Sequence, residues 1–209
     1  MSGRFIVLDG IDGCGKSTQL DHLARWLPRS GLMPSGVGLI RTREPGGTAL
    51  GAAVRQLLLH TSAEAAPAPT AELLLYAADR AQHVDSLIRP ALSRGDWVIS
   101  DRFSGSTLAY QGFGRGLDRS LIEALERIAT GGLAPDVTVL LDLPVQASIL
   151  RRSGAQDDRI ESEGAPFLRR VQGGFRQLAL ERRWCRLNAD RPIAEVSAAL
   201  EQSLRELLT

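Results

Sequence analysis

Short hydrophobic stretches alternate with longer amphipathic stretches along the chain. Five of the short stretches are typical of β-strands: Arg4–Asp9, Gly38–Thr42, Trp97–Ser100, Val137–Leu143 and, with the weakest pattern, Cys185–Asn188. Several of them are almost continuously hydrophobic. This pattern indicates strands that are buried on both faces of a parallel sheet.

The longer stretches repeat hydrophobic residues at helical spacing. They are Ser17–Leu27, Leu50–His60, Thr70–Arg94, Arg119–Thr130, Pro144–Arg152, Pro166–Arg183 and Ile193–Leu208. Because strands and helices alternate, we predict an α/β fold, a doubly wound parallel sheet of about five strands flanked by helices. Ligands of such sheets bind beyond the carboxyl ends of the strands.

Two stretches show neither pattern. Thr61–Pro69 is rich in alanine and proline and predicts a loop between helices. The glycines at 112, 114 and 116 predict a mobile connection at Gln111–Leu117. We find no internal repeat and no low-complexity tail, so we expect one domain over residues 1–209.

The most specific chemical signal follows the first predicted strand. Residues Gly10–Ser17 read Gly-Ile-Asp-Gly-Cys-Gly-Lys-Ser and lie between a strand and a helix, which is the context of a phosphate-binding loop. Its glycines let several backbone N–H groups turn toward one anion, and the helix start adds a positive dipole end. Lys16 can reach the outer phosphates of a nucleoside triphosphate, and the Ser17 hydroxyl can bind Mg2+.

The distribution of lysine supports this interpretation. The chain has 25 lysine and arginine residues, and Lys16 is the only lysine. A compact, flexible ammonium suits a phosphate-binding loop, and a planar guanidinium is not interchangeable with it.

The bulk composition excludes several classes of protein. A net charge of +1 gives no sign of a nucleic-acid or membrane surface, and no hydrophobic run approaches the ~20 residues that span a bilayer. The start Met1–Phe5 runs directly into the first predicted strand, so we expect no signal peptide. Cys14 and Cys185 are too few for a disulfide framework, so we expect a reduced, cytoplasmic protein.

A polar segment follows the second predicted strand. Thr42–Thr48 reads Thr-Arg-Glu-Pro-Gly-Gly-Thr, which predicts a rigid turn with charged groups at the open end of the sheet. Arg55 follows within the next helix and could turn toward the same cleft. Considered alone, the segment fits a solvated surface turn equally well.

Tyr76 and Arg80 are four residues apart on a predicted helix and therefore share one face. An aromatic ring and a guanidinium placed in this way can hold a planar base by stacking and hydrogen bonding. The alternative is a partly buried tyrosine above a surface arginine.

Asp101 and Arg102 close the third predicted strand. An aspartate at a strand end beside a phosphate loop can orient Mg2+ through water, and the arginine can hold a phosphate with two hydrogen bonds. The alternative is an ordinary ion pair at the end of a strand. The following segment, Ser106–Gly112, offers hydroxyl and amide groups suited to reading the edge of a base.

Several arginines lie where another helix ends. Arg151 and Arg152 are followed by Gly154 and by Asp158–Glu161, a short polar segment. This arrangement predicts a mobile lid, at about residues 151–162, that carries guanidinium groups over a phosphate cleft. The alternative is a solvated basic helix end.

Four of these stretches, in this order and spacing, resemble thymidylate kinase. They are Gly10–Ser17, Thr42–Thr48 with Arg55, Asp101–Arg102 with Ala109–Gly112, and Asp158–Glu161. The resemblance covers nearly the whole chain, from residue 4 to about residue 208. It implies a P-loop nucleoside monophosphate kinase that transfers the γ-phosphate of ATP to dTMP, giving dTDP for dTTP biosynthesis, with Mg2+ and usually as a homodimer.

The resemblance also implies roles for individual residues. Tyr76 lies where the family stacks an aromatic ring on thymine, most often phenylalanine; its hydroxyl is a mild departure that leaves stacking intact. Arg80, Thr107 and Gln111 would bind the base, Arg102 and Arg55 the dTMP phosphate, and Asp12 the sugar 3′-hydroxyl. The full set of residues expected to bind dTMP is Asp12, Glu44, Pro45, Arg55, Tyr76, Arg80, Arg102, Thr107, Tyr110 and Gln111.

The remaining expectations concern ATP, the metal ion and catalysis. Residues expected to bind ATP are Gly10, Ile11, Asp12, Gly13, Cys14, Gly15, Lys16, Ser17, Thr18 and Arg151. Ser17 and Asp101 are the expected metal ligands. Some family members follow the loop acid with arginine, whereas Gly13 and Cys14 stand here, so the chain resembles the bacterial branch with catalytic arginines in the lid. The expected catalytic residues are Asp12, Lys16, Arg102, Arg152 and Arg159.

Three other interpretations compete with this one. Another P-loop monophosphate kinase would differ only in its acceptor substrate. A guanine nucleotide switch would need an Asn-Lys-x-Asp element, which a chain whose only lysine lies in the phosphate loop cannot supply. A purely structural protein would have no use for four polar clusters at strand ends.

Overall fold

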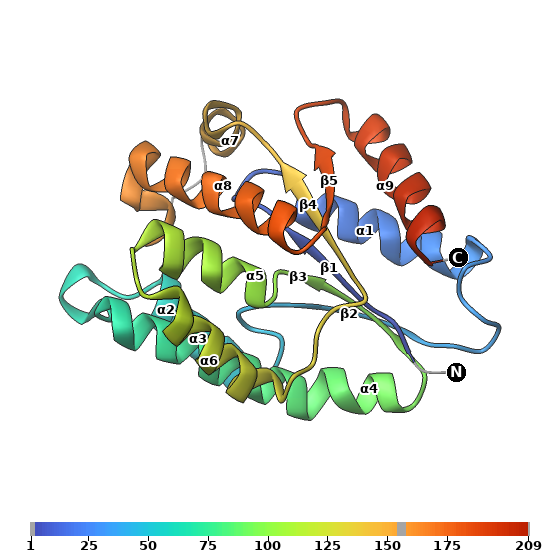
Figure 1. Ribbon diagram of the computed structural model, residues 1–209, viewed down its shortest axis with the longest axis horizontal. Coiled ribbons are helices and arrows are strands. Elements are labelled where there is room, and N and C mark those ends of the chain that lie inside the picture. Colours follow the sequence, from blue (N-terminus) through green and yellow to red (C-terminus); the bar gives the residue numbers. More distant parts are fainter. Residues whose placement is uncertain (1–2, 154–157, 209) are drawn as a thin grey trace.

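The computed structural model describes residues 3–153 and 158–208 and contains one parallel sheet of five strands (Figure 1). The sheet order is β2-β3-β1-β4-β5. The strands are β1 (Phe5–Asp9), β2 (Leu39–Arg43), β3 (Trp97–Asp101), β4 (Val137–Asp142) and β5 (Cys185–Asn188). All five predicted strands are therefore present, and the predicted α/β class is confirmed.

All seven predicted helical stretches contain helices, and the structure adds a helical segment over residues 104–114 that was not predicted. The α-helices are α1 (Lys16–Trp26), α2 (Ala49–Leu59), α3 (Pro69–His83), α4 (Arg89–Ser93), α5 (Ser104–Thr107), α6 (Arg119–Thr130), α7 (Val145–Arg152), α8 (Gly164–Glu181) and α9 (Ile193–Leu208). Short 3-10 turns are η1 (Leu27–Arg29), η2 (Ala63–Ala65) and η5 (Glu161–Glu163), and π-helical turns are η3 (Val84–Ile88) and η4 (Leu108–Gly114). Figure 1 shows α1 and α9 on one side of the sheet and α2 to α6 gathered on the other.

The central strand β1 shows why the sheet is buried on both faces. All five of its side chains are inaccessible, from Phe5 to Asp9. It pairs with β3, with Ile6 opposite Ile99, and with β4, with Leu8 opposite Val139. Continuous hydrophobic strands of this kind need helices on both faces. The carboxyl ends of β1 and β3 consequently lie side by side, which brings Asp9 and Asp101 to the same edge of the sheet.

The predicted helix Thr70–Arg94 is interrupted. It divides into α3, the π-helical turn η3 and α4. Pro90 lies at the start of α4 and has no N–H group, so the regular α-helical hydrogen-bond pattern cannot continue through this position.

The prediction of a mobile connection at Gln111–Leu117 is wrong for the first half of this segment. Residues up to Gly114 belong to the helical turn η4, and Gln111 is 1% exposed. A Cβ atom on Gly114 would lie 2.7 Å from the Phe167 ring, so this glycine permits the close packing of α8 against η4. The glycine there serves close packing and not mobility.

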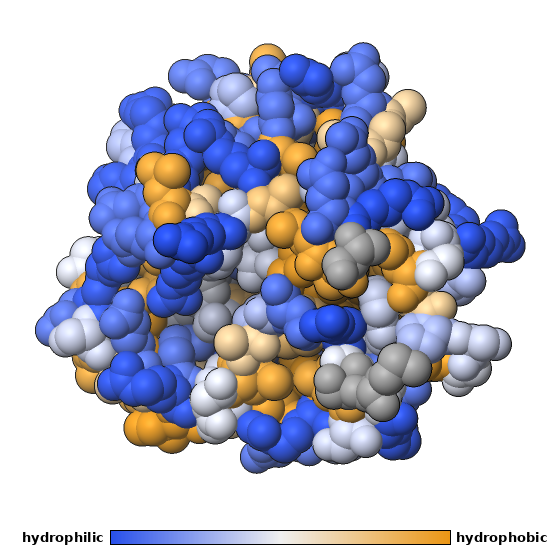
Figure 2. Space-filling model, turned by 45° about the vertical axis from the view of Figure 1, so that its right-hand side comes forward, coloured by the Kyte–Doolittle hydropathy of each residue, from blue (hydrophilic) through white to orange (hydrophobic). Residues whose placement is uncertain are grey.

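No helix among the described residues is long and apolar enough to cross a membrane. Figure 2 shows one face of the molecule, on which hydrophilic residues form most of the outline and hydrophobic residues appear between them in small groups.

Candidate active site

The phosphate loop connects β1 to α1, as its position in the sequence predicts. Gly13 and Gly15 have φ angles of 74° and 95°, a left-handed conformation that residues with a Cβ atom rarely adopt. Gly15 immediately precedes Lys16, where α1 begins. The loop therefore ends on unpaired N–H groups at a helix start, where phosphate groups bind readily.

Lys16 is directed back along its own loop. Its Nζ atom donates hydrogen bonds to the carbonyl oxygens of Gly10 (3.1 Å) and Ile11 (3.2 Å), and it lies 3.8 Å from the Cys14 sulfur. The side chain is only 6% exposed. Burial raises the pKa of the Cys14 thiol above its ordinary value, which disfavours the reactive thiolate form.

Ser17 and Asp101 meet at the adjacent strand end. The Ser17 hydroxyl donates to Asp101 Oδ2 at 3.3 Å, and the buried Asp101 Oδ1 atom has no hydrogen-bond partner among the residues that the structure describes. Two hard oxygen ligands beside a phosphate loop fit Mg2+, which is usually held by one or two protein groups together with phosphates and water. The expected metal ligands are thus brought together.

Arg102 lies at the centre of the polar network. Its Nη1 atom donates to the Gly10 carbonyl (2.9 Å) and to the Ser106 hydroxyl (3.0 Å), and its Nη2 atom donates to Asp12 Oδ1 (2.5 Å). Its backbone φ angle is 69°, in the left-handed region that non-glycine residues seldom occupy. A conformation of this kind is characteristic of functional sites, where surrounding contacts hold it in place.

Asp12 is ionised by its surroundings. Burial opposes its negative charge, but the positive charges of Arg102 and Lys16 outweigh burial and hold the pKa of Asp12 well below its usual range. The Tyr110 hydroxyl adds a hydrogen bond to Asp12 Oδ2 at 2.8 Å. The Asp12 carboxylate is therefore available as a hydrogen-bond acceptor at neutral pH.

All ten residues expected to bind dTMP line one small cavity of about 70 Å³. They come from the phosphate loop, the segments after β2 and β3, and the helical segments α2, α3, α5 and η4. Four further residues complete the lining: Leu59, Ser106, Asp158 and Ile160. Tyr76 forms part of the wall, and burial raises the pKa of its hydroxyl, so the ring carries no charge at neutral pH.

A second cleft of about 460 Å³ adjoins this cavity. Asp12, Glu44, Arg55 and Arg102 line both. Of the residues expected to bind ATP, those that line the cleft are Asp12, Gly13, Gly15, Lys16, Ser17, Thr18 and Arg151. The side chains of Ile11 and Cys14 instead pack into the hydrophobic core, and Gly10 is not part of the lining.

The two candidate lid arginines lie in different places. Arg152 lines the cleft, and its Cγ atom would lie 3.2 Å from a Cβ atom on Gly13. Arg159 donates from Nε to the Leu58 carbonyl at 2.7 Å and forms an ion pair with Glu72. In this conformation Arg152 is at the phosphate loop and Arg159 is not. Residues 154–157 of the predicted lid lie outside the described residues.

The comparisons with known proteins agree with this geometry. The family model described as thymidylate kinase matches residues 8–200. The chain is 70% identical to a thymidylate kinase of Parasynechococcus marenigrum (strain WH8102) and 68% identical to one of Synechococcus sp. (strain CC9605), in each case over 208 residues and all of both chains. The chain belongs to the thymidylate kinase family. The crystal structure of thymidylate kinase from Ehrlichia chaffeensis superposes with a TM-score of 0.76 at 33% identity, covering 98% of this chain and 99% of that one.

Within this thymidylate kinase fold, Arg80 is more heavily engaged than the sequence suggests. It is 2% exposed and donates to Glu44 Oε2 (2.8 Å) and Thr107 Oγ1 (2.9 Å), and it forms an ion pair with Glu126. Glu44 also contacts His83. A buried charge needs such partners, and they fix the guanidinium at the wall of the small cavity.

Sequence reasoning missed Glu72 and Glu126 of this network and assigned no individual role to Asp9 or Ser106. Asp9 accepts a hydrogen bond from Ser106 at 2.6 Å, and Ser106 in turn accepts one from Arg102. Glu126 holds Arg80, and Glu72 holds both Arg115 and Arg159. Asp9 could have been found as the polar end of a buried strand. The other partners lie far apart in the sequence and leave no local signal.

We expect Asp9→Asn to stabilise the protein more at pH 8 than at pH 5. Burial, only partly offset by Ser106, Arg102 and Lys16, raises the pKa of Asp9 from 3.8 to about 6. The folded state therefore binds this proton more tightly, and stability falls as pH rises from about 4 to above 6. Asparagine has no charge, so the variant does not lose this stability as the pH rises. The increase in the free energy of unfolding caused by Asp9→Asn should be larger at pH 8 than at pH 5 by on the order of 1 kcal/mol, which denaturant titration measures.

The control for this experiment is Asp85→Asn, which removes an exposed carboxylate in η3. Its effect on stability should not change between the two pH values. An Asp9→Asn protein whose stability changes equally at pH 5 and pH 8 would show that Asp9 titrates normally in the folded state.

Proposed function

We propose that this protein transfers the γ-phosphate of ATP to dTMP, giving dTDP. The observation that carries the proposal is the convergence of all ten expected dTMP residues on one cavity, which shares four residues with the phosphate-loop cleft. A donor nucleotide in the cleft and an acceptor in the cavity would meet at Arg102 and Asp12. Family membership supports the same substrates.

The reaction requires positioning and charge stabilisation by the protein, and no covalent protein intermediate. A dTMP phosphate oxygen is the nucleophile. Arg102 and Arg55 hold that phosphate, while Lys16 and Arg152 stabilise negative charge that spreads over the transferred group. Mg2+, held through Ser17 and Asp101, would neutralise part of the phosphate charge.

The base would lie against Tyr76, with Arg80, Thr107 and Gln111 at its edge. We expect Tyr76→Ala to weaken dTMP binding by on the order of 1–3 kcal/mol, the scale of base–aromatic stacking in single strands. Tyr76→Phe should bind nearly as well as the parent, because stacking needs only the ring. Isothermal titration with dTMP measures both, and equal affinity of Tyr76→Ala and the parent would contradict stacking.

A coupled ADP-release assay tests the function directly. We expect turnover with dTMP and much lower turnover with CMP, UMP and AMP, while dUMP measures how strictly the site requires the thymine methyl group. The nearest competing function is another P-loop monophosphate kinase. A higher kcat/KM with CMP, UMP or AMP than with dTMP would establish that function instead.

We further infer a homodimer built on α2, α3 and α6. These helices pack against one another and expose five large hydrophobic side chains: Leu50, Leu57, Leu74, Leu121 and Ile128. Ile128 is the most exposed of the five at 78%, and a group of exposed hydrophobic side chains on neighbouring helices is typical of an interaction surface. Two unpaired cysteines also support a reducing, cytoplasmic location.

A further inference from the structure

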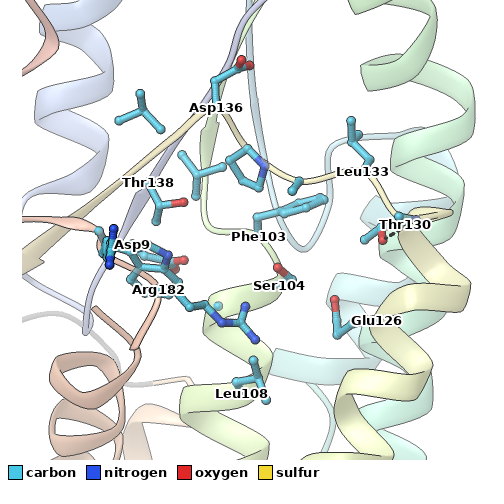
Figure 3. Close-up of a pocket in the computed structure, with 18 of the residues that line it drawn as sticks. Asp9, Phe103, Ser104, Leu108, Glu126, Thr130, Leu133, Asp136, Thr138 and Arg182 are labelled. Atoms are coloured by element: carbon cyan, nitrogen blue, oxygen red, sulfur yellow. Dashed lines mark hydrogen bonds between the residues drawn. The ribbon is translucent and has the colours of Figure 1, made fainter. Parts of the chain in front are cut away.

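A cavity larger than either substrate cleft lies apart from both of them. It has a volume of about 610 Å³ and is lined by β1, β4, α5, α6, the segment after α6 and the turn between α8 and β5. Figure 3 shows Asp9, Phe103, Ser104 and Glu126 around its interior, with Arg182 reaching in from the end of α8. Cavities of this size commonly hold small molecules of nucleotide dimensions.

The helix α5 separates this cavity from the proposed dTMP cavity. Ser106 and Thr107 line the dTMP cavity, whereas Ser104 and Gly105 line the large one. The two cavities have no lining residue in common. An occupant of the large cavity would therefore contact the back of the dTMP site without competing for it.

Two buried carboxylates of the lining each have one unused acceptor atom. Asp9 is fully buried and Glu126 is 7% exposed. Within the described residues, Asp9 Oδ2 and Glu126 Oε2 have no hydrogen-bond partner, although the other oxygen of each is bonded to Ser106 or Arg80. Buried polar atoms normally have partners, so these two point to a hydrogen-bond donor supplied by a ligand or water.

Three exposed arginines line the cavity: Arg127, Arg182 and Arg183. Glu123 and Asp136 also line it, and Asp136 is paired with Arg4 outside the cavity. Arg182 has an ion-pair contact with Glu123 at 3.7 Å, which is a long and weak one. Clustered guanidinium groups bind phosphate well, because each offers several N–H donors in one plane.

We propose that this cavity binds a nucleoside phosphate, with the phosphate on the arginines and the N–H edge of the base on Asp9 and Glu126. Phe103, Leu108 and Leu133 supply an apolar wall for the sugar and the ring. Guanine fits best, because its N1 and N2 atoms present three N–H donors along one edge, more than thymine, adenine or cytosine offers. The site extends beyond the proposed kinase reaction and does not depend on it.

The position of the cavity also determines whether a bound ligand raises or lowers the affinity for dTMP. Asp9 holds Ser106, which binds Arg102, and Glu126 holds Arg80. A ligand that donates to the free oxygens leaves these bonds in place and stabilises the arrangement that lines the dTMP cavity. It should therefore increase the affinity for dTMP, and dTMP should increase the affinity for the ligand by the same factor.

Titration calorimetry with GMP tests this proposal on the full-length protein saturated with dTMP and ADP. We expect one GMP per chain in addition to the bound substrates, and binding at least 10-fold weaker for guanosine and for inorganic phosphate alone. IMP, which lacks the N2 amino group, should bind more weakly than GMP. Displacement of GMP by dTMP or ADP would place it in a substrate site and overturn the proposal.

The decisive variant is the double substitution Arg127→Gln and Arg182→Gln. It should weaken GMP binding at least 10-fold while the phosphorylation of dTMP without GMP stays at the parent rate. The matched control is Arg169→Gln, an exposed arginine of α8 outside the cavity, which should bind GMP as the parent does. Equal GMP affinity in the double variant and the parent, or no binding at millimolar GMP, would overturn the proposal. Because GMP binding is measured apart from turnover, a failure of this site and a failure of the proposed kinase activity are distinguishable.

Discussion

Lys16→Arg should fold normally and lose most of its turnover. The Lys16 ammonium fits within the loop, where it donates to two backbone carbonyls and is 6% exposed. A guanidinium is larger, planar and unable to act as a compact charge, so it cannot occupy the same position beside the transferred phosphates. Loss of one preorganised charged donor at a reacting group costs about 10²–10³ in kcat, and we expect at least the lower figure.

The ADP-release assay measures this loss, and a thermal melt shows whether the variant is folded. Arg25→Lys makes the reverse exchange near the end of the same helix α1, outside the phosphate loop, and should leave kcat unchanged. Near-parental turnover of a folded Lys16→Arg protein would show that this ammonium has no specific role.

Arg152→Ala should lower kcat far more than it raises the KM for dTMP. Negative charge on the transferred group needs more cation than Lys16 and Mg2+ supply, and Arg102 is expected to bind the dTMP phosphate. Arg152 lies against the phosphate loop beside Gly13 and contacts Glu161 at 3.4 Å. Arginine fingers contribute about 10³–10⁵ in turnover, which is an upper guide here. An interaction made mainly in the transition state appears in kcat.

Alanine variants of Arg151 and Arg159 provide the comparison with Arg152→Ala. Arg151 on the same helix donates to the Ala189 carbonyl, and Arg151→Ala should be milder. Arg159→Ala should also lower kcat, but because Arg159 is bonded to Glu72 and to the Leu58 carbonyl, its loss should also loosen this contact and raise KM. If Arg152→Ala and Arg159→Ala both keep kcat within a few-fold while Arg102→Ala is inactive, catalysis does not use the lid.

The sequence was most informative where a local pattern is compatible with few structures. The five strands were predicted because runs such as Phe5–Leu8 are hydrophobic on both faces, which few other structures tolerate. The dTMP residues were placed because their order resembles a known family, and the fold then brings them to one cavity.

The failures share a physical cause. Glycine in a sequence indicates either flexibility or close packing, and at Gly114 only the position of Phe167, 53 residues away in the chain, decides between them. In the same way, the partners of Arg80 and Arg159 come from other helices, so no local pattern shows that these arginines are already engaged. Long-range pairing of buried charges had to come from the structure.

The left-handed backbone at Arg102 has a consequence for engineering this protein. A non-glycine residue in that conformation raises the free energy of the folded state by about 1–3 kcal/mol, and glycine would not. Arg102→Gly would relieve this backbone cost, but it would delete the side chain that joins Gly10, Asp12 and Ser106 and leave the Asp12 carboxylate without its ion pair. Losing one partner of a buried ion pair costs about 3–5 kcal/mol, which exceeds the backbone strain. The contacts of the guanidinium therefore keep the backbone in this conformation, and an engineered variant gains no stability by replacing the arginine with glycine.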